Sequence, residues 1–174
     1  MNRILGLVAG VGFVLAAYVH ALTFYPGRSI VTDGGASIWL LHIGMFAVFA
    51  PMVLAMRQLF GAQASWQSQM SLFPPSARIA LGVAMIYTLF NFAFFVSTTE
   101  GEPEIRSRDF ALMSHGRFIR SLSQDEYFAL KRRMVRGFSG HWLLFYLAPT
   151  LFFLTARAPL PRRRSDDGRG GGSA

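Results

Sequence analysis

The stretch RGFSGHWLLFY, residues 136–146, passes from charged to strongly apolar sequence within a few residues. Leu, Phe and Tyr dominate the run that follows it. Such a boundary is typical of a helix entering a lipid bilayer, because charged side chains stay near the headgroups while apolar ones enter the hydrocarbon. Four basic residues stand just upstream or at its start: Lys131, Arg132, Arg133 and Arg136.

The composition of the chain agrees with a membrane protein. Hydrophobic residues make up 52% of the 174 residues and charged residues 15%, with a mean hydropathy of +0.36. A soluble domain carries about 25% charged residues. Cysteine is absent, which excludes disulfides, thiolate metal sites and cysteine redox chemistry. We assign the net charge of +8 to arginines at membrane edges rather than to nucleic-acid binding.

Four segments are apolar and long enough to span roughly 30 Å of hydrocarbon at 1.5 Å per residue. The sequence therefore predicts an all-α integral membrane protein, in which residues 1–160 form a bundle of four transmembrane helices. Residues 161–174 are basic and glycine-rich, which predicts a disordered tail. The four predicted spans are residues 4–25, 38–56, 79–96 and 142–160.

The N-terminal segment has two interpretations. Its apolar run after Arg3, with a possible cleavage site at Ala21, resembles a secretory signal. The run continues to Pro26, however, and contains the small-residue pair Gly6 and Gly10, which lets membrane helices approach closely. We favour a retained helix. Cleavage would leave three spans.

The loop between the third and fourth spans, residues 98–140, predicts a small extramembrane module that begins with a hairpin. Two short strand-like runs, residues 110–114 and 117–120, flank His115 and Gly116. Glycine tolerates the positive φ that a two-residue hairpin turn requires. An acidic, extended turn is expected before the hairpin, over residues 100–104.

A helix follows the hairpin in this module. Ser123 and Glu126 have the spacing of a capping box, in which each side chain accepts a hydrogen bond from the backbone N–H of the other residue. Basic residues close the helix, which suits its dipole, and Gly137 is expected to end it before the fourth span begins. The module is thus predicted to be a hairpin plus a helix.

The orientation in the membrane has weak support in the sequence, since basic residues are nearly balanced between the two sides. Arg3 stands before the first span with no acidic residue nearby, and the first helix often decides orientation. We therefore expect a bacterial inner membrane protein with both termini in the cytoplasm. The 98–140 module then lies on the outer side.

All four histidines are predicted to lie on the side of the 98–140 module. Ionisable residues within membrane spans are rare and are functional candidates. His20, His42 and His141 are therefore candidate ligands for haem b or a transition metal, with His115 as a further metal ligand. The alternative is that the intramembrane histidines form hydrogen bonds between helices and that His141 caps the fourth span.

Two other groups of residues have candidate roles near the membrane surface. Trp142, Trp39 and Tyr25 are expected to form an interfacial aromatic belt. The cluster Lys131, Arg132, Arg133 and Arg136 is a candidate site for anionic lipid headgroups, or simply the solvated end of a well-capped helix.

The sequence favours a non-enzymatic role as an accessory or assembly subunit, which packs in the bilayer with other membrane proteins or with itself. No carboxylate lies inside a predicted span, which argues against a proton-coupled exporter. One alternative is a redox protein that binds b-haem or a transition metal. A third is an enzyme acting at the lipid surface through His115, His141 and Glu126.

Overall fold

The computed structural model describes residues 2–26, 35–61, 65–106 and 108–156. Four of its helices are long and apolar enough to cross a membrane. The predicted tail, residues 161–174, and the end of the fourth span lie outside the described residues. The four long helices are α1 (Arg3–Leu22), α3 (Gly35–Phe60), α5 (Pro75–Thr98) and α6 (Gln124–Thr155).

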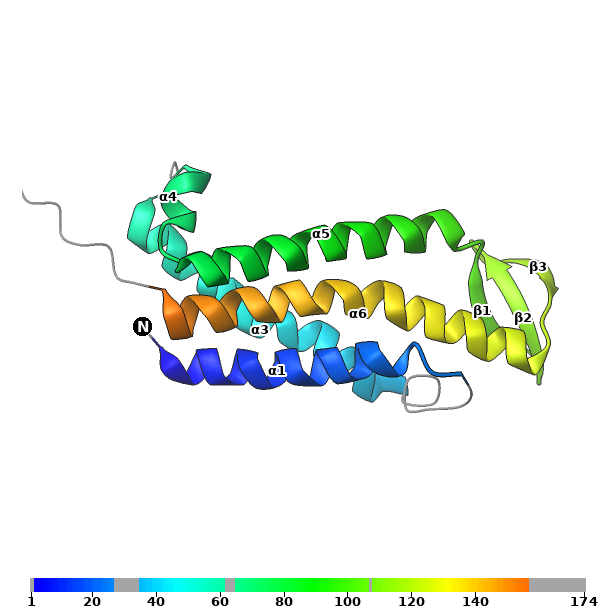
Figure 1. The fold of residues 1–174 in the computed structure, drawn as a ribbon. Helices are drawn as coiled ribbons and strands as arrows, with labels where there is room; N and C mark the ends of the chain where they lie inside the picture. Colours follow the sequence, from blue (N-terminus) through cyan, green and yellow to red (C-terminus); the bar gives the residue numbers. More distant parts are fainter. Residues whose placement is uncertain (1, 27–34, 62–64, 107, 157–174) are drawn as a thin grey trace, which may run out of the picture.

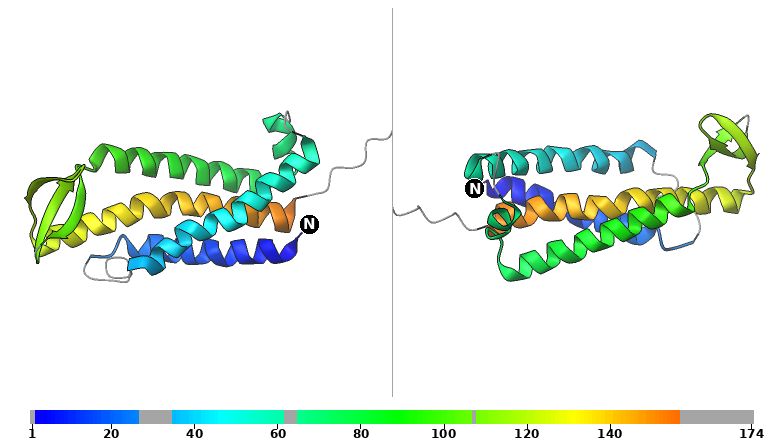
Figure 2. Two further views of the ribbon diagram at one scale, coloured as in Figure 1. Left: turned by 180° about the vertical axis from the view of Figure 1, so that it is seen from behind. Right: turned by 90° about the horizontal axis from the view of Figure 1, so that it is seen from above.

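Helix α6 is the centre of the bundle, and α1, α3 and α5 each pack against it (Figures 1 and 2). The N-terminus of α1 and the C-terminus of α6 lie at the same end (Figure 1). Trp142 and Tyr146 of α6 are buried in one core cluster with residues of α1 and α3. Phe152 is buried in a second cluster, nearer the C-terminus of α6, together with Met52 of α3.

Helices α1 and α6 approach closely because α1 presents small residues to α6. A Cβ atom added at Gly6 would collide with Leu154, and one added at Gly12 would collide with the ring of Tyr146. Ala9 and Ala16, on the same face of α1, are fully buried. Small residues have the role in this interface that the sequence predicted, although Gly12 rather than Gly10 makes the tighter approach.

The predicted break between the module helix and the fourth span is wrong, because α6 runs without interruption from Gln124 to Thr155. Its 32 residues measure about 48 Å, more than the thickness of the hydrocarbon. Gly137 does not end the helix. A Cβ there would collide with the ring of Phe95, and one at Gly140 would collide with the side chain of Asn91, so both glycines permit the close approach of α5.

The predicted all-α fold class is wrong in one respect, since a three-stranded antiparallel sheet precedes α6. Its strands are β1 (Glu102–Arg106), β2 (Asp109–Ser114) and β3 (Arg117–Ser121), in the order β1-β2-β3. The β2–β3 hairpin confirms the prediction, with φ of 48° at His115 and 77° at Gly116. The expected acidic turn is wrong, because most of that segment forms the edge strand β1, which pairs with β2.

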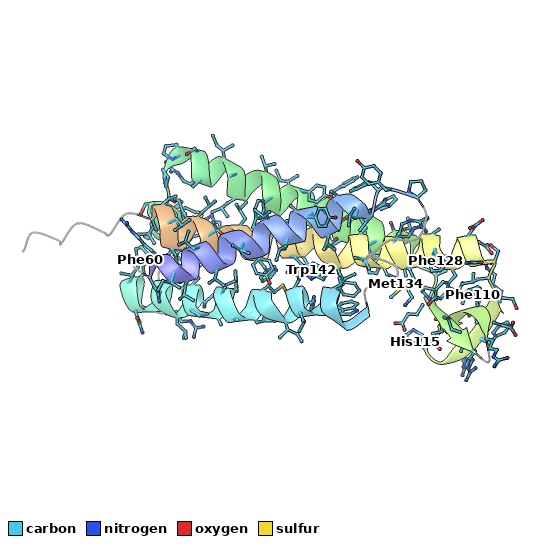
Figure 3. All side chains as sticks on the ribbon, turned by 90° about the horizontal axis from the view of Figure 1, so that it is seen from below. Phe60, Phe110, His115, Phe128, Met134 and Trp142 are labelled. Carbon is cyan, nitrogen blue, oxygen red and sulfur yellow. The ribbon has the colours of Figure 1, made fainter. Side chains whose placement is uncertain are left out.

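The sheet packs on the N-terminal part of α6, beyond the end of α5 (Figure 1). Phe110 of β2 lies beside Phe128 of α6, while His115 lies in the turn (Figure 3). Leu112 and Tyr127 are buried in the same cluster. The capping box at Ser123 and Glu126 is present as predicted. A short helix that the sequence did not predict, α4 (Trp66–Met70), lies between α3 and α5.

Candidate functional site

Polar side chains of α1, α5 and α6 meet in a group that we call the polar junction. At its centre, His20 is hydrogen-bonded through both ring nitrogens. Its Nδ1 atom lies 2.7 Å from Oγ of Ser139, and its Nε2 atom contacts the hydroxyl of Tyr87. His20 thus connects α1 to both α6 and α5. The polar junction comprises His20, Thr23, Tyr87, Thr88, Asn91, Arg136 and Ser139.

Arg136 donates hydrogen bonds to the C-terminal end of α1. Its Nη2 atom donates to the carbonyl of Thr23 at 2.7 Å, and its Nε atom donates to Oγ1 of Thr23 at 3.2 Å. The Thr23 hydroxyl in turn donates to the carbonyl of His20. The guanidinium also lies over the ring of Phe24, 4.4 Å from its centroid. A cation suits this position because a helix C-terminus carries partial negative charge.

Helix α5 is attached to α6 by side chains that donate to backbone carbonyls. The Nδ2 atom of Asn91 lies 3.1 Å from the carbonyl oxygens of both Arg136 and Gly137. Thr88 donates to the carbonyl of Gly140 at 3.2 Å. The glycines bring α5 close enough for these bonds, which form where water is scarce.

Every buried polar side-chain atom of the polar junction has a hydrogen-bond partner, and its serine hydroxyl is closed to substrates. Among the described residues, every buried side-chain nitrogen and oxygen has a hydrogen-bond partner. The pairing of a serine hydroxyl with an imidazole is one that nucleophilic enzymes use. Ser139 has no exposed surface, however, so no substrate can reach its hydroxyl without separating the helices. The arrangement supports helix attachment rather than catalysis.

A second group, the aromatic cluster, surrounds His42 between α3 and α6. The indole N–H of Trp142 donates to Nδ1 of His42 at 2.8 Å, and the His141 ring lies 5.6 Å from the His42 ring. Trp39 and Phe138 complete the aromatic cluster. Trp142 is 0% exposed, so its assignment to an interfacial belt is wrong: it is a core residue. Trp39 and Tyr25 are exposed.

The structure brings together only part of the predicted histidine site. His42 and His141 contact each other, whereas His20 belongs to the polar junction and His115 to the β2–β3 turn. No three His, Cys, Asp or Glu residues of the described chain are grouped so that they could hold a metal ion. Haem or metal ligation by a pair of these histidines stays a prediction.

The hydrogen bonds of the two intramembrane histidines limit that chemistry. A neutral imidazole has one lone pair, and in His42 it lies on Nδ1, where it accepts the Trp142 N–H. A metal bound at Nε2 would require this bond to break or the ring to lose its second proton. His20 has both nitrogens engaged, so a metal would displace Ser139 or Tyr87.

The predicted lipid-headgroup cluster makes several contacts within the protein. Arg136 is bonded to Thr23, and Arg133 donates from Nη1 to the carbonyl of Thr98 at 3.0 Å. Lys131 lies over the ring of Tyr127. The bonds of Arg136 and Arg133 attach the ends of α1 and α5 to α6. Binding of headgroups by Lys131, Arg132, Arg133 and Arg136 stays a prediction.

The sequence did not indicate that Arg136 and Thr23 are partners, because they lie 113 residues apart. The signal that was present is local: Thr88 and Asn91 are three residues apart on one face of α5, and Gly137 and Gly140 are three apart on α6. Small residues facing polar ones at this spacing are typical of a close membrane-helix interface.

The sequence matches no protein-family model, and it matches no curated protein and no solved structure.

Proposed function

We propose that the protein is a non-enzymatic assembly subunit of the membrane, and that it holds a partner membrane protein through the outer surface of strand β3. All five residues of β3 are exposed. Phe118 and Ile119 are 57% and 52% exposed, although the sheet lies beyond the end of the bundle, where lipid chains do not cover apolar side chains. This exposure is the observation that carries the proposal.

The chemistry of β3 suits a protein partner. Aromatic and arginine side chains are the commonest anchors of protein interfaces. Phe118 and Ile119 stand between Arg117 and Arg120, and Arg120 pairs with Glu126 at 2.9 Å. The register shift beside Leu112 and Met113 makes Ile119 the extra residue of a β-bulge, which hinders pairing with another strand. We therefore propose side-chain docking, by an acidic and apolar surface, rather than addition of a strand.

A non-enzymatic role is supported by the use of the buried polar groups. The polar junction and the aromatic cluster direct their hydrogen bonds at other helices, so their function is to hold the bundle together.

We propose the bacterial inner membrane as the location, with both termini in the cytoplasm and the sheet on the outer side. Four membrane-crossing helices support this arrangement, because an even number of crossings returns the chain to the side of the membrane where it began.

The test is site-specific photo-crosslinking in intact cells that express the full chain. A photoreactive phenylalanine analogue at position 118 is expected to give one discrete adduct, whose partner is identified by mass spectrometry and purified reciprocally. Ile105 on β1, at the opposite edge of the sheet and 61% exposed, is the matched control position.

Charge substitution tests the same surface independently. Phe118→Asp and Ile119→Asp are expected to release the partner and lower the native mass in mild detergent, whereas Ile105→Asp leaves the mass unchanged. A protein that migrates as a monomer before any substitution, with no adduct from position 118, would contradict the proposal.

A further inference from the structure

An apolar groove lies between α3 and α5, with α6 as its floor. Its volume is about 700 Å³, within the range of sites that hold small molecules. Both α3 and α5 pack on α6, and the groove occupies the space between them. Its walls include Phe49, Met52 and Met56 from α3, and Leu81, Gly82 and Met85 from α5.

One end of the groove is polar. Helix α4 contributes Trp66 and Gln69 there, and Arg78 from the first turn of α5 lies beside them. The exposed side chain of Arg78 makes no hydrogen bond or ion pair with any residue that the structure describes. A cation in the first turn of a helix opposes the helix dipole, and this turn contains no acidic residue. An anion at this position would pair with Arg78 and would also interact favourably with the N-terminal end of the helix dipole.

The groove walls differ from the helix interfaces within this protein. Where its own helices meet, Gly12, Gly137 and Gly140 let backbones approach closely, as is usual in membranes. The groove walls instead carry long, flexible methionines, among them Met52, Met56 and Met85. Methionine adapts to occupants of variable shape, which suits a flexible acyl chain better than a helix 10–12 Å wide.

We propose that this groove binds one anionic phospholipid, with an acyl chain along α3 and α5 and the phosphate against Arg78. Trp66 is exposed and lines the same groove as Arg78, so a phosphate held by Arg78 would place its amphipathic ring at headgroup depth, where such a ring is favoured. An acyl chain gains little by moving from the bilayer into an apolar groove. Selection of this lipid therefore rests on the phosphate and Arg78, as in other basic sites between membrane helices. The site does not depend on the docking of a partner on β3.

Native mass spectrometry of the full chain in mild detergent tests the site. After delipidation, the protein is titrated with phosphatidylglycerol or with phosphatidylcholine of matched chains. The wild type is expected to retain one phosphatidylglycerol in preference to phosphatidylcholine. Arg78→Gln is expected to weaken retention of the anionic lipid by about fivefold. Arg57→Gln removes the same charge from an exposed residue near the end of α3 and leaves retention unchanged.

Blocking the groove gives a second test. A Cβ added at Gly82 would have no atom within 4 Å, so Gly82→Phe is expected to fill the groove while the bundle stays folded. It should abolish retention of both lipids. Equal loss in Arg78→Gln and Arg57→Gln, or unchanged retention in Gly82→Phe, would overturn the proposal. So would a photoreactive residue placed at position 82 that crosslinks to a protein helix instead of to a lipid.

Discussion

The Oγ atom of Ser139 lies 2.7 Å from Nδ1 of His20, in an interface where Ser139 is fully buried and His20 nearly so. The two residues are 119 positions apart, so this bond closes the first helix onto the last. The same imidazole reaches Tyr87 on α5. One side chain therefore connects three helices, and its loss should weaken the packing of all three.

A double-mutant cycle measures this connection. We expect His20→Ala and Ser139→Ala each to lower the free energy of unfolding, with a coupling energy of about 0.5–2 kcal/mol, the range of hydrogen bonds between membrane helices. Unfolding is followed in mixed detergent micelles. Ser97→Ala, which removes an exposed bond within α5, is the control and should change stability by less than about 0.5 kcal/mol. Strict additivity of the two substitutions would show that the bond contributes nothing.

The glycines of α1 give a prediction about packing. Gly12→Ala places a methyl group into the ring of Tyr146 and is expected to destabilise the bundle by about 1–3 kcal/mol. Gly10→Ala is the matched control, because its methyl would meet Cγ2 of Thr150 at 3.6 Å, an ordinary contact. That variant should be neutral or slightly stabilising, since alanine favours a helix over glycine. Thermal unfolding in detergent compares the two, and equal effects would contradict the α1–α6 interface.

Arg136 gives a prediction about the end of α1. Arg136→Lys keeps the charge but loses the two-nitrogen contact with Thr23, because a lysine has a single ammonium group. Hydrogen exchange at the amides of Phe24 and Tyr25, which are bonded to the last turn of α1, should rise about tenfold. Arg133→Lys, whose bond is to Thr98 on α5, should leave those two amides unchanged.

The sequence predicted the features that depend on local pattern. Hydropathy indicated the four long helices, since a bilayer requires long apolar runs whatever their partners. The turn at His115 and Gly116 and the capping box at Ser123 were also predicted, because a few adjacent residues determine them.

Features that depend on distant partners were missed. Gly137 has the local appearance of a helix end, but Phe95 of another helix fills the space where its side chain would be. Trp142 has the position of an interfacial anchor, but His42 and Trp39 enclose it. His20 and His42 were predicted in one cluster because depth in the membrane can be counted along a helix. The rotation of each helix about its axis is harder to predict from the sequence than depth is. This rotation directs His20 into the polar junction and His42 into the aromatic cluster.

The exposed tryptophans allow a test of the corrected role of Trp142. In bilayers that contain brominated lipid, single-tryptophan variants are expected to differ: Trp66, at 65% exposure, is strongly quenched and fully buried Trp142 is not. Trp39 should lie between them. Quenching of Trp142 as strong as that of Trp66 would restore its assignment to the interfacial belt.

The capping box gives a prediction about the connection between β3 and the first turn of α6. Ser123 accepts from the amide of Glu126 at 3.2 Å, and the Glu126 carboxylate accepts from the amide of Ser123 at 2.8 Å. Ser123→Ala should cost about 1 kcal/mol of local stability, as loss of an N-cap usually does. Arg120→Gln, which removes the exposed ion pair with Glu126 and a 3.3 Å bond to the carbonyl of Ser121, should cost less than that. Hydrogen exchange of the first turn of α6 and of β3 measures both. A larger effect of Arg120→Gln would mean that the ion pair, rather than the cap, holds β3 against α6.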